Sequence, residues 1–260
     1  INPARPFLLT SAGQYGALLT EVSLRVDTAT RKLVHKSAHN HIVQGEAFTG
    51  SQGLVPLNAA VPAYPADPFV QQLVARYKAA AEPLAQRPVG RASAPLLRVR
   101  NASQESALGN LVADAQLAAT RAPEKGGAQL SFMNPGGLRA DLVPDAQGQL
   151  RYGQLFSVQP FGNNIMVRTY TGAQIRAVLE QQFAGGTSTL QSPRVLSASE
   201  GFGYRYALSQ PAGSRISQLT LHGKPLEDPA EVRVAISSFL ATGGGGSTGL
   251  LGGRDNAGRC

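Results

Sequence analysis

From residue 96 onward, helical and strand-like patterns follow one another along the chain, and this constrains the fold more than any other sequence feature. Apolar residues at a 3.6-residue period run from Leu108 to Ala119, after Ser103 as a candidate N-cap, and Thr171 to Gln174 form a capping box before a second helix. Runs rich in β-branched and aromatic residues predict strands at Gln129–Met133, Ile165–Tyr170, Tyr204–Leu208, Ile216–Leu221 and Val232–Ser237. The pattern predicts an α+β fold in which both helices pack against one mixed β-sheet.

The first part of the chain has a different pattern. Residues 7–44 predict strands, beginning at Phe7–Thr10 and continuing through Leu18–Val26 to a turn at Asp27–Lys32 and a returning strand. This piece is too small to stand alone as a domain. Residues 45–66 are rich in Gly, Pro and Ala without periodicity, which is typical of a connecting loop.

A single amphipathic helix is predicted after this loop. Asp67 serves as the N-cap and Pro68 as the first helical residue, and apolar residues recur at four-residue spacing from Phe69 until Pro83, which we expect to end the helix. The stretch from Pro88 to Pro95 marks a second boundary. This helix is therefore a candidate linker.

Composition and charge set further bounds. The chain has 260 residues, 42% of them hydrophobic, which is enough for a packed core. No apolar run is long enough to span a membrane, and the start at Ile1 lacks the pattern of a secretory leader. The net charge is +8, mostly from scattered arginines, and the single cysteine, Cys260, excludes an internal disulfide. The glycine-rich stretch Gly243–Gly253 predicts a far end without regular structure.

Two short segments have the composition of a ligand site. Asn134-Pro-Gly-Gly-Leu-Arg139 closes an apolar run with a tight turn, where backbone N–H groups and the planar guanidinium of Arg139 can converge on an anion. Gln159-Pro-Phe-Gly-Asn163 places an aromatic face beside an amide, which suits a nucleobase. The glycine run is not a P-loop, because it lacks the Gly-Lys-Ser/Thr end. The pair His39 and His41 does not indicate a metal site, because it has no third ligand nearby.

Together with Phe239-Leu-Ala-Thr-Gly-Gly, these segments resemble the C-terminal substrate domain of the secreted bacterial 5′-nucleotidase/UDP-sugar hydrolase family, over roughly residues 98–246. The resemblance implies that Phe161 and Phe239 clamp a nucleobase, that Arg139 contacts the substrate and that Asn163 bonds the base or ribose edge. It predicts no catalytic residue in this chain. The full set of expected substrate-binding residues is Asn134, Gly136, Gly137, Arg139, Phe161, Asn163, Phe239, Arg98 and Arg100.

Two positions depart from the family pattern. Relatives carry a carboxylate that grips ribose hydroxyls where this chain has Gly245, so one substrate contact is expected to be missing. Relatives of the best-known type have two arginines four residues apart, whereas Arg98 and Arg100 are two apart; on a strand both would lie on one face and could bind phosphate.

The resemblance also implies a domain organisation. Residues 1–50 are expected to be the last strands of a truncated metallophosphoesterase domain, 51–95 a loop and linker helix, and 96–260 the substrate-binding domain with its glycine-rich tail. The chain would then begin inside the catalytic domain, after that domain's metal-ligand motifs. Two divalent metals of the zinc or manganese type are implied for the intact enzyme and none for this chain, which we expect to be inactive alone.

The implied function is nucleotide recognition within a 5′-nucleotidase-like phosphoric ester hydrolase. Its partners would be a nucleoside or nucleotide and the catalytic domain, with no membrane or nucleic acid, in the periplasm or outside the cell. Two alternatives stay open. The basic chain suits a general polyanion-binding module if its arginines share one face, and Gly245 favours a domain that has lost its ligand and serves packing or assembly.

Overall fold

A computed structural model describes residues 7–13, 15–50, 53–184, 186 and 188–257. The chain forms two compact units, Ile1–Ala80 and Ala81–Cys260. Both ends named above, Ile1 and Cys260, lie outside the described residues.

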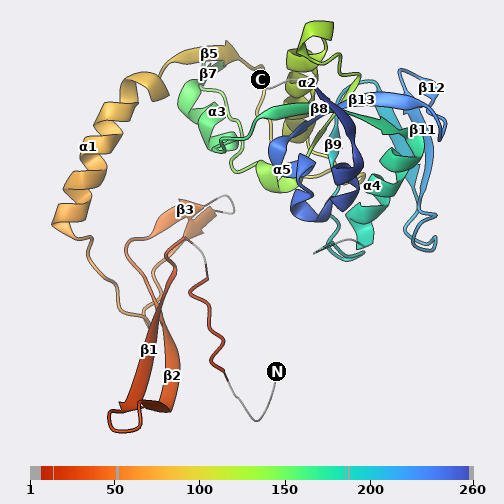
Figure 1. Ribbon diagram of the computed structural model, residues 1–260. Coiled ribbons are helices and arrows are strands. Elements are labelled where there is room, and N and C mark those ends of the chain that lie inside the picture. The colour runs from red at the N-terminus through yellow and green to blue at the C-terminus, as the bar shows by residue number, and fades with distance from the viewer. Residues whose placement is uncertain (1–6, 14, 51–52, 185, 187, 258–260) are drawn as a thin grey trace. The chain divides into compact units, whose positions relative to one another are not determined.

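The first unit is built around a long hairpin (Figure 1). Its strands are β1 (Leu18–Asp27), β2 (Lys32–Ile42), β3 (Phe48–Gly50) and β4 (Gly53–Val55). β1 pairs antiparallel with β2, and Asp27 closes the turn by accepting bonds from the N–H groups of Ala29 and Thr30 at 2.9 and 2.8 Å. The strand expected at Phe7–Thr10 is wrong, since these residues have no ladder partner among the described residues.

Helix α1 (Pro68–Ala85) begins as predicted: the Asp67 carboxylate accepts a bond from the N–H of Val70 at 3.0 Å. The expectation that Pro83 ends it is wrong by two residues. Proline removes only its own N–H from the helix, and the N–H of Gln86 still bonds the Glu82 carbonyl at 2.9 Å, so the last turn closes.

The second unit carries the remaining elements. Its helices are α2 (Ala107–Thr120), α3 (Tyr152–Val158), α4 (Gly172–Ala184) and α5 (Ser238–Ala241), with 3₁₀ turns η1 (Pro123–Lys125), η2 (Pro135–Gly137), η3 (Gly244–Gly246) and η4 (Thr248–Gly252). Its strands are β5 (Pro88–Arg91), β6 (Leu130–Met133), β7 (Gln149–Arg151), β8 (Ile165–Thr171), β9 (Ser197–Ala198), β10 (Phe202–Tyr206), β11 (Ile216–Leu221), β12 (Lys224–Pro225), β13 (Glu231–Ser237) and β14 (Arg254–Ala257). The α+β class with a mixed sheet is confirmed.

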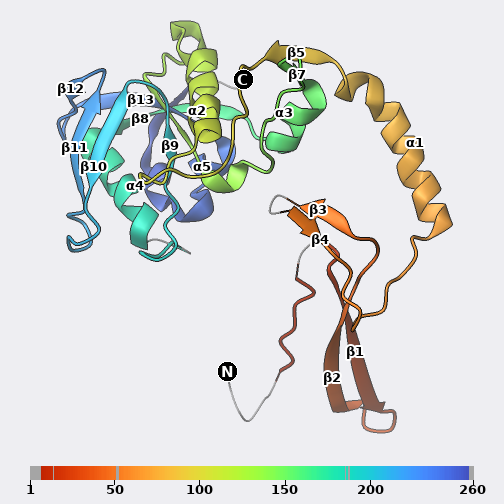
Figure 2. The same cartoon turned by 180° about the vertical axis from the view of Figure 1, so that it is seen from behind.

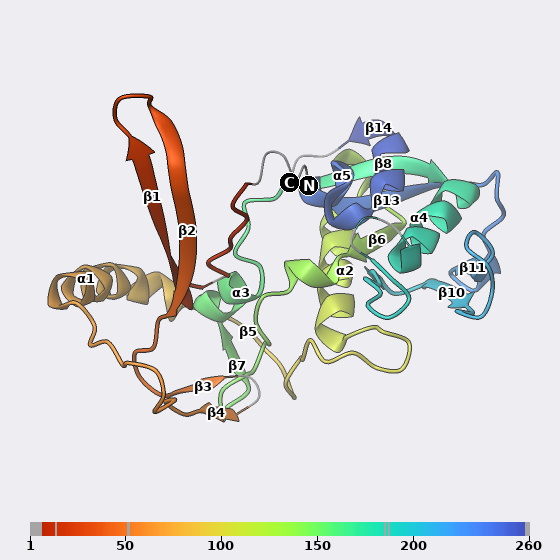
Figure 3. The same ribbon diagram turned by 90° about the horizontal axis from the view of Figure 1, so that it is seen from below.

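A five-stranded sheet with the order β14-β8-β13-β6-β9 forms the centre of this unit. β13 pairs parallel with β6 and antiparallel with β8, which runs beside it in Figure 3. The prediction that β10 and β11 belong to this sheet is wrong. They pair with each other, and β11 with β12, in a separate three-stranded sheet, because their apolar side chains, such as Ile216 and Leu219, reach the core beside α4 instead.

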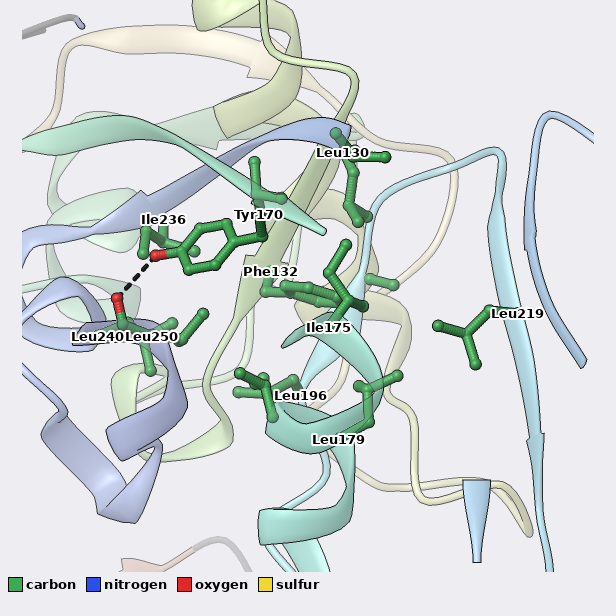
Figure 4. Packing of buried hydrophobic residues seen from close by; sticks show 14 of the residues in the cluster. Leu130, Phe132, Tyr170, Ile175, Leu179, Leu196, Leu219, Ile236, Leu240 and Leu250 are labelled. Atoms are coloured by element: carbon green, nitrogen blue, oxygen red, sulfur yellow. Dashed lines mark hydrogen bonds between the residues drawn. The ribbon is translucent and has the colours of Figure 1, made fainter. Parts of the chain in front are cut away.

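The two faces of the central sheet are covered by different helices, as Figures 1 and 2 show from opposite sides. Alternate residues of one strand point to opposite faces, so Val234 and Ile236 of β13 join the cluster of α4, while Ala235 between them packs with Leu117 of α2. In the larger cluster Tyr170 is buried, and its hydroxyl donates to the Leu250 carbonyl at 2.7 Å (Figure 4).

The helix starts of this unit follow capping chemistry. The capping box before α4 is confirmed: Thr171 and Gln174 each accept a bond from the other's N–H, at 3.2 and 2.8 Å. The N-cap of α2 is Ser106 and not Ser103, because a tight turn at Asn101–Glu105 delays the helix and the Ser106 hydroxyl accepts from the N–H of Gly109 at 3.1 Å.

The glycine-rich stretch is more regular than expected. It forms η3 and η4, and the chain then continues as β14, which pairs antiparallel with β8. The prediction of an irregular far end at Gly253 is therefore wrong. The buried Leu250 anchors this stretch, since its carbonyl accepts bonds from both Tyr170 and Arg168.

Candidate functional site

A pocket of about 370 Å³ lies at one edge of the central sheet. β6 and β13 run parallel, so their carboxyl ends meet there, and β8 begins at the same edge because its first residue, Ile165, pairs with Ser237. The carboxyl edge of such strands is where α/β proteins commonly place ligands. The pocket is lined by Met133, Asn134, Pro135, Gly136, Gly137, Arg139, Gln159, Phe161, Asn163, Arg194, Leu196, Ser237, Phe239, Gly245 and Ser247.

The structure brings together most of the residues that the sequence singled out, although they come from three separate segments. Those that line the pocket are Asn134, Gly136, Gly137, Arg139, Phe161, Asn163 and Phe239. Arg98 and Arg100 are not among the lining residues. The pocket therefore has the two aromatic rings and one of the three arginines named from the sequence.

The turn after β6 is held by its own backbone. The N–H of Gly137 donates to the Asn134 carbonyl at 3.0 Å, and the N–H of Arg139 donates to the Val158 carbonyl at 2.9 Å. Gly137 is buried, and a side chain there would collide with Met133. A side chain at this position would require the flexible end of Met133 to move, and the turn fixes the backbone from which the exposed Arg139 side chain extends.

Both aromatic rings are half exposed, with 48% of Phe161 and 44% of Phe239 open to solvent. A Cβ at Gly244 would collide with the Phe239 ring, so this ring lies directly against the glycine backbone. Phenylalanine is usually buried, and two half-exposed rings in one pocket give an apolar surface that a flat ligand can cover.

Polar groups lie beside the rings. Asn163 accepts a bond from the Ser238 hydroxyl at 3.2 Å through its Oδ1 atom, so its side chain is tied to the start of α5. The Arg139 guanidinium donates to the Gly136 carbonyl at 3.4 Å. Gln159 donates to the Gly137 carbonyl at 3.0 Å, which joins the two segments recognised in the sequence.

Arg98 and Arg100, which are not among the lining residues, bond to other protein groups. Arg98 donates to the Asp141 carboxylate through its backbone N–H and its Nε atom, at 2.8 and 3.1 Å, and to the Arg139 carbonyl at 3.1 Å. The bond from the Arg98 backbone N–H is the main reason why the pKa of Asp141 lies below its usual value. Arg100 donates to the Pro193 carbonyl at 3.1 Å. Each arginine thus holds a carbonyl in a segment that reaches the pocket.

Sequence reasoning missed four polar lining residues: Gln159, Arg194, Ser237 and Ser247. Gln159 belongs to the segment Gln159–Asn163 that the sequence singled out, but no role was predicted for its side chain. Arg194 lies in the loop between α4 and β9, outside any motif, and its only sequence signal is the apolar run that follows it. Only the fold brings this loop to the ends of β6 and β13.

The lining residues include two arginines and no carboxylate, histidine or cysteine. Among all described residues, no group of three or more His, Cys, Asp or Glu side chains could hold a metal ion. The described residues therefore do not fit the two divalent metals that the resemblance implies for the intact enzyme. In the same part of the chain, no helix is both long and apolar enough to cross a membrane.

Known proteins resemble this chain in sequence and in fold. The trifunctional nucleotide phosphoesterase protein YfkN of Bacillus subtilis is 27% identical over 259 residues, which cover 95% of this chain and 16% of that protein. The crystal structure of a 5′-nucleotidase precursor from Thermus thermophilus matches with 28% identity and a TM-score of 0.61, covering 94% of this chain and 45% of that one. The chain thus spans less than half the length of these relatives.

A putative 5′-nucleotidase from Staphylococcus aureus, solved in complex with alpha-ketoglutarate, is 15% identical with a TM-score of 0.63 over 94% of this chain and 46% of that one, which shows a shared fold. The family of the 5′-nucleotidase C-terminal domain matches residues 88–251, a segment that contains the whole pocket. Since this match covers well over half of the 260 residues, the chain belongs to the 5′-nucleotidase C-terminal domain family.

Proposed function

We propose that this chain recognises a nucleoside or nucleotide for a 5′-nucleotidase-like phosphoric ester hydrolase. One observation carries the proposal: Phe161 and Phe239, far apart in sequence, line one pocket together with Arg139. A base between two rings gains about 1–3 kcal/mol from each stacked face, whatever its identity. The pocket therefore suits nucleotides as a class.

In this proposal, the polar lining residues bind the phosphate, the ribose and the edge of the base. The Arg139 guanidinium binds the phosphate or ribose by charge-assisted hydrogen bonds, and Asn163 bonds the edge of the base or ribose. Asn134, Gly136 and Gly137 form the turn that carries Arg139. For Arg98 and Arg100, which bond to carbonyls of the pocket segments, we propose that they hold those segments in place.

Hydrolysis belongs, in this proposal, to a dimetal metallophosphoesterase domain of the family, for which residues 96–260 present the substrate. Residues 1–50 would supply the last strands of that domain and residues 51–95 the linker. A periplasmic or secreted location is supported by a cell wall protein of Listeria monocytogenes, Lmo0130, which is 33% identical over 151 residues, 55% of this chain and 18% of that protein.

Calorimetric titration with adenosine and 5′-AMP in metal-free buffer tests the binding. Phe161→Ala should weaken both ligands about tenfold or more, since it removes one stacked face. Phe156→Ala is the matched control, because Phe156 is 57% exposed and lies outside the pocket lining. No saturable binding below about 10 mM, an affinity of roughly 3 kcal/mol, would contradict the proposal and favour a ligand-free assembly domain.

The same titration separates the polyanion-binding alternative. Binding driven by phosphate contacts weakens steeply as salt rises and does not depend on the base. Binding in the aromatic pocket should instead persist for uncharged adenosine and change little between low and moderate salt. Tight, salt-sensitive binding of a mixed-sequence oligonucleotide that Phe161→Ala leaves unchanged would favour the alternative.

A further inference from the structure

Arg194 gives the pocket a second guanidinium that the proposed function does not use. It extends from the loop between α4 and β9 and lines the same pocket as Arg139, Ser237 and Ser247. Its side chain is exposed, so it can meet a ligand without first being uncovered.

The backbone around Arg194 is fixed from the side of α4. The Arg194 N–H donates to the Gln182 carbonyl at 3.0 Å, and the Leu196 N–H donates to the Gln182 side-chain oxygen at 2.6 Å. Gln182 is buried, and its amide nitrogen donates to the Leu179 carbonyl at 2.9 Å. One glutamine therefore holds both backbone groups that flank Val195.

The same loop is held from the other side by Arg100, which donates to the Pro193 carbonyl at 3.1 Å. Arg98 makes the corresponding bond to the Arg139 carbonyl, also at 3.1 Å. Arg139 and Arg194 thus each lie in a segment in which a backbone carbonyl accepts a hydrogen bond from another arginine. A guanidinium on a fixed backbone loses less conformational freedom when it binds a planar or tetrahedral anion.

The chemistry of the lining shows what this second cation suits. Ribose hydroxyls are commonly recognised by a carboxylate, whereas an arginine at the sugar accommodates a phosphate on it. The lining residues include no carboxylate, and Gly245, which has φ of +69°, contributes only backbone. The pocket therefore offers two guanidiniums and two hydroxyls to the part of the ligand that the rings do not cover.

We propose that Arg194 binds an anionic group on the ribose, so that this pocket prefers nucleotides that carry a 2′- or 3′-phosphate in addition to the group bound by Arg139. The inference rests on the proposed function, because the rings must first hold the base. It names a subclass of ligand: sugar-phosphorylated nucleotides bind more tightly than the matching 5′-monophosphate.

The test compares four ligands on the full chain by calorimetry, in metal-free buffer of constant ionic strength. They are adenosine, 5′-AMP, adenosine 2′,5′-bisphosphate and adenosine 3′,5′-bisphosphate. At least one bisphosphate should bind about tenfold more tightly than 5′-AMP, as expected for one added charge-assisted contact. Arg194→Gln should abolish this gain, and an unchanged midpoint temperature in scanning calorimetry shows that the variant is folded.

Arg205→Gln is the control for net charge, since Arg205 is an exposed arginine of β10 outside the pocket lining. It should keep the full gain. If 5′-AMP and both bisphosphates bind with equal affinity, the inference is overturned. The proposed function still stands in that case, provided that adenosine binds. A gain that survives in Arg194→Gln, or is lost equally in Arg205→Gln, also overturns it. Failure of adenosine and 5′-AMP to bind overturns both proposals together.

Discussion

At the scale of single residues, Gly244 determines where the Phe239 ring lies. A Cβ at this position would collide with both the ring and the carbonyl of Phe239. Gly244→Ala must therefore shift the backbone next to Phe239 together with its ring, and we expect the adenosine affinity to fall by about tenfold, close to the effect of losing one stacked face. Calorimetric titration of the variant measures this directly.

Gly90→Ala is the matched control, because a Cβ on Gly90 meets nothing within 4 Å. It should bind adenosine as the parent chain does. An unchanged affinity in Gly244→Ala would mean that the position of the Phe239 ring does not matter for binding, and the two-ring clamp would then be contradicted.

Some pocket residues were predictable one by one, and others were not. Arg139 and Phe161 sit in short segments whose composition indicates a turn and an aromatic face, so local sequence is enough to single them out. Arg194 has no such local pattern and reaches the pocket only through the loop that Gln182 holds. Arg98 and Arg100 stand two apart as on a strand, yet they lie in irregular backbone and bond to different carbonyls.

At the scale of elements, the positions of strands were easier to predict than their pairing. β8, β13 and β11 all appear where β-branched residues gather, but a period of two does not say which strand lies beside which. The two-residue strand β9 at Ser197–Ala198 is too short for any periodicity, although it completes one edge of the central sheet. Pairing depends on contacts between distant segments, which no local window contains.

Gln182 of α4 tests how one helix positions the loop before β9. Gln182→Leu keeps the side chain's size but leaves the Leu196 N–H without its side-chain acceptor, a buried loss that costs about 1–3 kcal/mol. We expect the free energy of unfolding, from urea denaturation, to fall by that amount, and hydrogen exchange at Leu196 to become faster. Unchanged exchange at Leu196 would show that this bond does not hold the loop.

At the scale of the whole molecule, the two units differ in how much they bury. All residues of the hydrophobic core belong to the second unit, whereas no residue between 7 and 80 whose exposure the structure describes is buried. All pocket residues also lie in the second unit, between Met133 and Ser247. The buried core and the candidate pocket therefore lie in the same part of the chain, Ala81–Cys260.

A fragment of residues 81–260 should accordingly fold and bind as the full chain does. Burial of apolar surface is the main stabilising contribution to folding, and removing a unit without buried residues takes little of it away. We expect the fragment to unfold in one cooperative transition with nearly the same midpoint temperature, and to bind adenosine with the affinity of the full chain. Scanning calorimetry and titration measure both quantities. A midpoint lower by more than about 3 °C, roughly 1 kcal/mol for a domain of this size, would show that the first 80 residues contribute to the stability of the pocket-bearing unit.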